Sequence, residues 1–196
     1  MDCLALVHLV RGDPQKSIAA AEEAIKAYQQ GTWEHTVIYV LNVEGLAYLE
    51  LRQIDRAIDC LDRANREARM VEDIRVEGMT RLNLAHAWRV KGDTTQALRH
   101  AEEAVSIFTR TQGGELVPAQ ALVDALRANG AGLAAAEARA LVKVAQASLS
   151  NPDLLNPRSF LQDAVTLAQG VNRPEIAAEA DQLAAAIRAR TGAQLA

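Results

Sequence analysis

The chain has 196 residues, enough for one ordinary domain or about five helical hairpins of roughly forty residues each. Hydrophobic residues make up 49% and aromatic residues only 4%, and the excess is alanine, which favours helices that approach one another closely. The formal net charge is −4 without a block of like charge, which excludes the clustered basic face typical of nucleic-acid binding.

The first residues form an apolar run over residues 3–10 that is too short to span a membrane. The run follows Asp2 rather than a basic residue, so it is a poor signal peptide. The only cysteines, Cys3 and Cys60, form no C-x-x-C pair, and nothing in the sequence requires an oxidising compartment. We therefore expect a cytoplasmic protein without a membrane partner.

A repeat runs along the first half of the chain. Ser17, Ala57 and Ala97 lie forty residues apart, and each has the same arrangement of small, apolar and turn residues around it. A fixed period of this length is typical of stacked helical hairpins, each of which buries its apolar face against its neighbours. Period-two runs of β-branched residues are missing, so the sequence predicts helices throughout.

The first unit ends one helix at the turn Gly12-Asp13-Pro14 and continues with an apolar stripe on the next helix. Its opening residues, Leu4 among them, have no preceding unit to cover them, and solenoids normally need a polar capping unit. We expect the chain to be the C-terminal module of something longer, with self-association through this uncapped N-terminal end.

The second unit begins near Val37 and turns over residues 51–54. Gly45, Ala57 and Ala64 are small where two helix backbones would cross, which indicates a packing role. The basic residues of its second helix, 63, 66 and 69, alternate with acids and therefore predict a solvated face with ion pairs, not a nucleic-acid partner.

The third unit turns at Gly92-Asp93-Thr94, where Gly92 can take a positive φ and Asp93 or Thr94 can cap the next helix. Beyond residue 110 the register breaks. The pattern there predicts helices over residues 117–128, 133–149, 158–169 and 174–190. We interpret residues 1–110 as three hairpins, and residues 111–196 as an inserted helix, a divergent fourth hairpin and a C-terminal capping helix of the same solenoid.

The order of small, aromatic, Gly-Asp and alanine positions resembles the tetratricopeptide repeat (TPR). The matching residues are Gly45, Tyr48, Ala57, Leu61 and Ala64 in one unit and Leu84, Ala85, Trp88, Gly92, Ala97 and Ala104 in the next. The resemblance covers about residues 1–110 and implies an all-α, right-handed α-solenoid of helix-turn-helix hairpins. The forty-residue step is longer than the common 34 and is similar to repeats in bacterial regulators of the MalT-like, nucleotide-switch (STAND) class.

The resemblance implies that partners bind the concave face, which the first helix of each hairpin lines. Carried over by register, the expected binding residues are Tyr39, Asn42, Leu46, Leu49, Glu50, Met79, Leu82, Asn83, His86 and Arg89. Much of this set is apolar, which suggests a groove for a helix or a hydrophobic peptide. The alternative is that the next helices of the superhelix, or a further domain, cover these residues.

One family function is disfavoured, because chaperone tails are held by a cationic clamp that needs charge-assisted donors. The matching positions here are Asp2, Leu6, Val43, Met79 and Asn83, and only the last would suit.

Signatures of catalysis are missing from the sequence. His8, His35, His86 and His100 form no metal-ligand pair, and His100 is expected on an outer helix face. Phosphate-binding glycine motifs and a G-x-S-x-G nucleophile turn do not occur. We therefore expect no enzyme activity, no cofactor and no metal.

The sequence thus predicts a non-catalytic scaffold that binds a protein or peptide segment, or an adjoining domain, within a bacterial signalling or transcriptional regulator. The alternative is a sensor that binds a small peptide or metabolite and changes its superhelical pitch.

Overall fold

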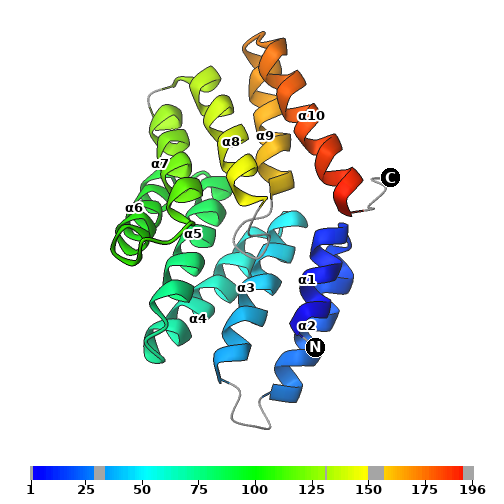
Figure 1. Cartoon of the computed structure of the whole chain (residues 1–196), viewed down its shortest axis with the longest axis vertical. Helices are drawn as coiled ribbons and strands as arrows, with labels where there is room; N and C mark the ends of the chain where they lie inside the picture. Colours follow the sequence, from blue (N-terminus) through cyan, green and yellow to red (C-terminus); the bar gives the residue numbers. More distant parts are fainter. Residues whose placement is uncertain (1, 29–33, 131, 150–156, 192–196) are drawn as a thin grey trace.

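The computed structural model describes residues 2–28, 34–130, 132–149 and 157–191, and this part of the chain contains ten helices and no strand (Figure 1). The first six helices are α1 (Asp2–Arg11), α2 (Pro14–Tyr28), α3 (Glu34–Glu50), α4 (Ile54–Met70), α5 (Ile74–Lys91) and α6 (Thr94–Thr111). The last four are α7 (Leu116–Gly130), α8 (Ala134–Ser148), α9 (Pro157–Gly170) and α10 (Pro174–Thr191). The predicted all-α solenoid of helical hairpins is confirmed.

The predicted turn chemistry is present between α5 and α6. Gly92 adopts the left-handed conformation with φ of 91°, and the side chain of Asp93 accepts a hydrogen bond from the backbone amide of Gln96 at 3.0 Å. A left-handed glycine ends one helix without a Cβ penalty, and an N-cap aspartate satisfies a free amide of the next. The sequence therefore correctly predicted both the end of α5 and the start of α6.

Residues with positive φ recur along the whole chain at the same forty-residue step. Gly12, Arg52, Gly92, Gly132 and Asn172 lie between α1 and α2, α3 and α4, α5 and α6, α7 and α8, and α9 and α10. One such residue thus lies between the two helices of each of these five helix pairs. The division of the chain into two parts at residue 110 stays a prediction.

Consecutive helices pack along the whole series, and the buried side chains form two clusters that meet at α5. One cluster contains α1 to α5, and the other contains α5 to α10. The side chain of Trp88 packs against both clusters. The solenoid therefore consists of an N-terminal block and a C-terminal block joined through one central helix.

In the first four hairpins, the first helix of each contacts the first helix of the next, along the series α1, α3, α5 and α7. In the last hairpin the second helix, α10, contacts the second helix of the hairpin before it, α8. The last hairpin is therefore stacked differently from the others. Figure 1 shows α10 running from the far end of the molecule back toward α1. Among the described helices, none combines the length and the apolar composition that crossing a bilayer requires.

Candidate functional site

The ten residues expected to bind a partner all lie on α3 or α5. Seven of them are buried, namely Asn42, Leu46, Leu49, Met79, Leu82, Asn83 and His86. The other three, Tyr39, Glu50 and Arg89, are partly buried. Most of the expected binding residues are therefore buried within the chain, and their role in binding a partner stays a prediction.

The start of α9 lies against two of these residues, His86 and Arg89. The ring of His86 stacks on the ring of Phe160, with centroids 3.9 Å apart and planes at 27°. Its Nε2 lies 3.2 Å from the hydroxyl of Ser159, and Arg89 approaches the same phenyl ring to 5.4 Å. Burial lowers the pKa of His86 well below its usual value, and the nearby positive charges of Arg89 and Arg52 lower it further.

Two of the expected binding residues, Asn42 and Asn83, bind each other. The side-chain amide of Asn83 donates to the side-chain oxygen of Asn42 at 2.6 Å, across two neighbouring hairpins. Both residues are almost fully buried. This hydrogen bond joins α3 to α5, while the side-chain oxygen of Asn83 is buried without a hydrogen-bond partner among the described residues.

Two charged residues on α9, Arg158 and Asp163, bind the N-terminal block. We name these two residues, together with their partners, the seam latch. Arg158 donates from Nη1 to the carbonyl of Leu9 at 3.3 Å and from Nη2 to the carbonyl of Val10. The same guanidinium lies 3.7 Å from a carboxylate oxygen of Glu50. The last carbonyl groups of a helix have no partner within its regular hydrogen-bond series. The carbonyl of Leu9 accepts from the amide of Gly12 at 3.0 Å, and α9 adds a further donor to it and one to the carbonyl of Val10.

The second half of the seam latch is Asp163. Its Oδ1 accepts from Nη2 of Arg52 at 3.0 Å, and its Oδ2 accepts from Nη2 of Arg89. The carboxylate thus connects α9 to the α3–α4 turn and to α5 at once. Charge-assisted bonds are stronger than neutral ones, so this group fixes where α9 lies against the N-terminal block.

A cleft of about 560 Å³ remains where the two blocks meet, and we name it the seam cleft. The N-terminal block contributes Gly12, Pro14, Leu49, Glu50 and Arg52. The C-terminal block contributes Arg158, Ser159, Leu161, Gln162, Val165, Thr166, Ala180, Asp181 and Ala184. Of the ten expected residues, only Leu49 and Glu50 line this cleft.

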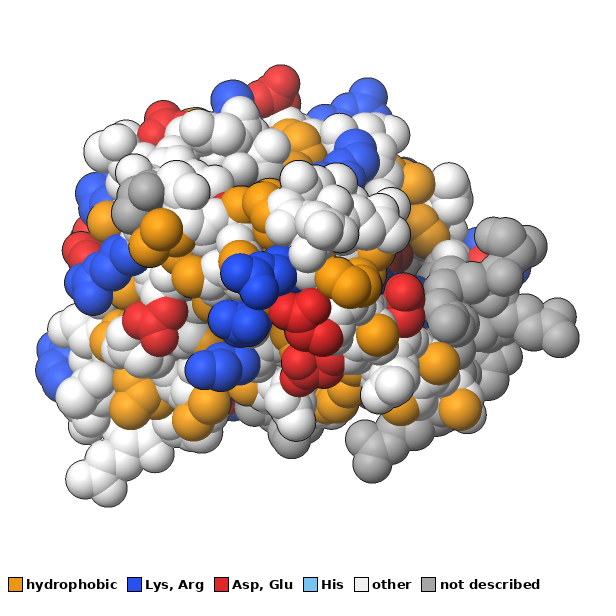
Figure 2. Space-filling model, turned by 90° about the horizontal axis from the view of Figure 1, so that it is seen from above, with side chains coloured by type: hydrophobic (Ala, Val, Ile, Leu, Met, Phe, Trp, Pro, Cys, Tyr) orange, Lys and Arg blue, Asp and Glu red, His pale blue; other side chains and the backbone are white. Residues whose placement is uncertain are grey.

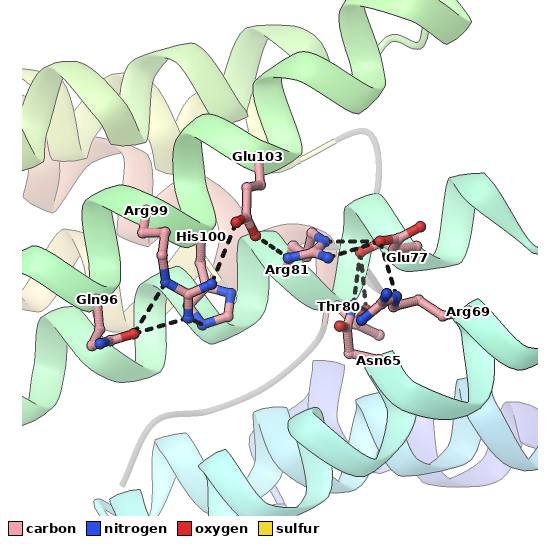
Figure 3. Close-up of polar contacts among 9 residues, drawn as sticks. All are labelled: Asn65, Arg69, Glu77, Thr80, Arg81, Gln96, Arg99, His100 and Glu103. Atoms are coloured by element: carbon pink, nitrogen blue, oxygen red, sulfur yellow. Dashed lines mark hydrogen bonds and ion pairs between the residues drawn. The ribbon is translucent and has the colours of Figure 1, made fainter.

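A second polar network joins α4, α5 and α6 (Figure 3). Arg81 pairs with Glu77 one turn away on α5, at 2.9 Å, and with Glu103 on α6. The side-chain amide of Asn65 donates to the hydroxyl of Thr80 at 2.8 Å. Each of these polar groups is satisfied by a neighbouring helix, which indicates a packing role.

His100 belongs to this network and corrects one expectation. Its side chain is only 6% exposed, so it does not lie on an outer face as predicted. Burial, followed by the neighbouring charge of Arg99, lowers its pKa to about 4. The side chain of His35 lies outside the described residues.

The described side chains offer little for catalysis. They contain no group of three or more His, Cys, Asp or Glu residues that could hold a metal ion. Burial raises the pKa of the Cys60 thiol to about 12, so the reactive thiolate is disfavoured. Burial also raises the pKa of Glu44, which packs beside this thiol.

The end of the molecule viewed in Figure 2 shows basic and acidic side chains next to one another, between hydrophobic patches. Ion pairs such as that of Arg139 with Glu175, at 3.8 Å, have this mixed character. A face of this kind lacks the uniform positive potential that binds phosphate backbones.

Comparison with known proteins gives a fold and no closer relative. No family model matches the chain, and no curated protein matches it. Among solved structures, a Rap protein complexed with competence and sporulation factor is similar with a TM-score of 0.71 and 14% identity. The match covers 96% of this chain and 62% of the Rap protein, so the chain spans less than two thirds of that protein's length.

Two other similar structures are repeat proteins, and the match covers most of each. Nearly identical TPR-like repeats of a kinesin light chain from Podosopora anserina match with a TM-score of 0.58 and 17% identity, over 97% of this chain and 94% of theirs. BtubC (BKLC) from P. vanneervenii matches with a TM-score of 0.58 and 14% identity, over 98% of this chain and 80% of its own. At these identities the likeness establishes the fold: the chain is a TPR-like α-solenoid.

Proposed function

We propose that the chain is a non-catalytic interaction module that binds a peptide segment of a partner protein in the seam cleft. The observation that carries the proposal is the cleft itself, an opening of about 560 Å³ with walls from both blocks of the solenoid. Its lining combines an apolar floor with a few charged and polar groups, which is the usual make-up of a ligand site. The similarity in fold to a Rap protein complexed with a factor supports the same proposal.

The proposed partner is a protein or peptide, and the setting is a bacterial signalling or transcriptional regulator in the cytoplasm. The long repeat step supports this setting through its resemblance to repeats of MalT-like regulators. The mixed charges of the surface support a partner other than nucleic acid.

Two threonines provide a matched test. Thr166 lines the cleft on α9, and Thr109 lies on α6; both are exposed, and both donate their hydroxyl to the carbonyl four residues earlier. We expect Thr166→Arg to abolish capture of the partner from host lysate, while Thr109→Arg retains it, with equal helicity by circular dichroism. Equal capture by both variants would refute the location.

Charged substitutions in the groove expected from sequence cannot serve as this test. Leu46 and Leu82 are fully buried, so an acidic residue there would disrupt folding before it affected binding.

A second function is favoured by the size of the cleft, which lies within the roughly 300–1,000 Å³ of small-molecule sites. In this alternative the chain is a sensor for a small peptide or metabolite. Such a ligand should stabilise the isolated chain by about 2.7 kcal/mol at a hundredfold excess over its dissociation constant. A module that binds only macromolecules would show no such response to small compounds.

A further inference from the structure

The turn residue Arg52 is unusual for its place in the repeat. At the same position of the first, third and fourth hairpins the chain has Gly12, Gly92 and Gly132, with φ of 84°, 91° and 70°. Arg52 takes φ of 56° in this left-handed region, which glycine adopts freely and a residue with a Cβ disfavours. The fifth hairpin has Asn172 at this position with φ of 53°, so Arg52 is one of two exceptions to glycine among these turns and has the longer, charged side chain.

The guanidinium of Arg52 forms part of the cleft wall. It is 49% exposed and donates from Nη2 to Asp163 at 3.0 Å. Asp163 also forms an ion pair with Arg89, so two guanidinium groups share one carboxylate. Positive charge is therefore left over at this wall, and it faces the cleft on the side that Arg52 lines.

The opposite wall has an unpaired acid. Asp181 lies on α10, is exposed and lines the same cleft, and it makes no ion pair or hydrogen bond within the part of the chain that the structure describes. The lining also includes four apolar side chains, those of Leu161, Val165, Ala180 and Ala184. The cleft thus combines Arg52 from the N-terminal block, Asp181 from α10 and an apolar surface, whereas its other two charged residues, Glu50 and Arg158, lie near each other at 3.7 Å.

We propose that the seam cleft binds a short peptide whose free C-terminal carboxylate pairs with Arg52 and whose positive group, farther along the peptide, pairs with Asp181. The proposal rests on the proposed function and adds the chemistry of the ligand. Arginine binds carboxylates through charge-assisted bonds, often two in parallel, and aliphatic side chains of the peptide would cover the apolar floor. A C-terminal carboxylate entering the cleft competes with Asp163 for Arg52.

The probe is the tetrapeptide acetyl-Lys-Ala-Leu-Leu with a free carboxylate, and its control is the same peptide as the C-terminal amide. Binding to the whole chain is followed by chemical-shift titration with ¹⁵N-labelled protein. We expect the carboxylate form to bind at least tenfold more tightly than the amide, with shifts at the residues lining the cleft. Replacing the probe's lysine by norleucine should weaken binding to wild type but not to Asp181→Asn.

Three variants separate a binding role of Arg52 from a role in the seam latch. Arg52→Gly should lose at least tenfold in affinity, and its folding is protected because glycine suits the turn. Asp163→Asn breaks the same ion pair yet keeps Arg52, so it should bind the carboxylate probe as tightly as wild type or more tightly. Arg127→Gln removes a surface arginine that pairs with Glu102 at 3.1 Å, remote from the cleft, and should change nothing.

Equal losses in Arg52→Gly and Asp163→Asn would mean that only the latch matters, and the proposal would be overturned. Equal binding of the acid and the amide, or no binding of either, would also overturn it. The proposed function is judged separately by capture of the partner with Thr166→Arg, so its failure remains distinguishable.

Discussion

At the scale of single residues, the sequence correctly predicted where two helices pack closely, because glycine or alanine stands at those positions. A Cβ built on Gly45 would lie 2.6 Å from Cγ of Leu61, and Ala57 and Ala64 are fully buried. The sequence identified these positions because close helix packing excludes larger side chains from them. Residue type alone is enough to reveal such a constraint.

Gly45→Ala should therefore destabilise the protein. Alanine gains about 1 kcal/mol in helix propensity, but the clash with the branch point of Leu61 costs about 1–3 kcal/mol, so we expect a net loss near 1 kcal/mol in chemical denaturation. The matched control is Gly130→Ala, where no atom lies within 4 Å of the added Cβ, and this change should leave stability equal or slightly higher. A stability gain in Gly45→Ala would contradict the packing role.

The buried histidines make stability depend on pH. The pKa of His86 is well below its usual value, and that of His100 is lowered to about 4, so the unfolded chain binds more protons than the folded one at mildly acidic pH. The stabilising contribution is complete above about pH 6.5 and declines as the pH falls below it.

We expect the free energy of unfolding to fall between pH 6.5 and 4, and the decline to be shallower in His100→Asn. His100 faces charges from two helices, namely Arg99 and Glu103 on α6 and Arg81 on α5. Denaturant midpoints measured at half-unit pH steps test this expectation. An unchanged slope in the variant would show that this histidine does not contribute.

At the scale of elements, helix boundaries were predicted within a few residues, because glycine, proline and capping residues mark them locally. The predicted helix over residues 117–128 corresponds to α7, which ends two residues later, at Gly130. The seam latch could not be predicted in this way. Arg158 binds α1 from 149 residues away, and no local pattern encodes so distant a contact.

One signal for Arg52 was nevertheless present in the sequence. It stands forty residues after Gly12 and forty before Gly92, so the repeat alone marks it as an exception to glycine. Asp163 offered no such signal, because its importance arises only when α9 lies beside α3 and α5.

If the seam latch holds α9 in place, breaking it should loosen this helix. Asp163→Asn removes the charge that pairs with Arg52 and Arg89 and should weaken the docking of α9 by about 1–2 kcal/mol. Amide hydrogens after Asp163 should then exchange faster, while those of α6 do not change. Glu102→Gln, which breaks an exposed ion pair with Arg127, is the control and should leave exchange in α9 unaltered. Unchanged exchange in both variants would exclude a latch.

At the scale of the whole molecule, the solenoid bends until its last hairpin lies against its first two. The sequence predicted the stacking of hairpins but not this closure, because curvature depends on the small rotation at each helix interface. The start of α9 then lies against His86 and Arg89, two of the expected binding residues, and the seam cleft opens where the two blocks meet.

Self-association through the N-terminal end remains a proposal. Leu4 and Val7 are exposed apolar residues on α1 and could form the contact. We expect sedimentation velocity to show a concentration-dependent dimer that Leu4→Glu abolishes. A monomer at all concentrations for the wild-type chain would count against α1 as an interface.

The most direct test of the account is hydrogen exchange of the chain with and without the partner segment recovered by capture. We predict added protection at the seam cleft, over residues 49–52, 158–166 and 180–184, with unchanged exchange at residues 39–46 and 79–86. Added protection at residues 39–46 and 79–86 together with faster exchange in α9 would contradict the account. It would mean that the partner displaces α9 and binds the groove beneath it.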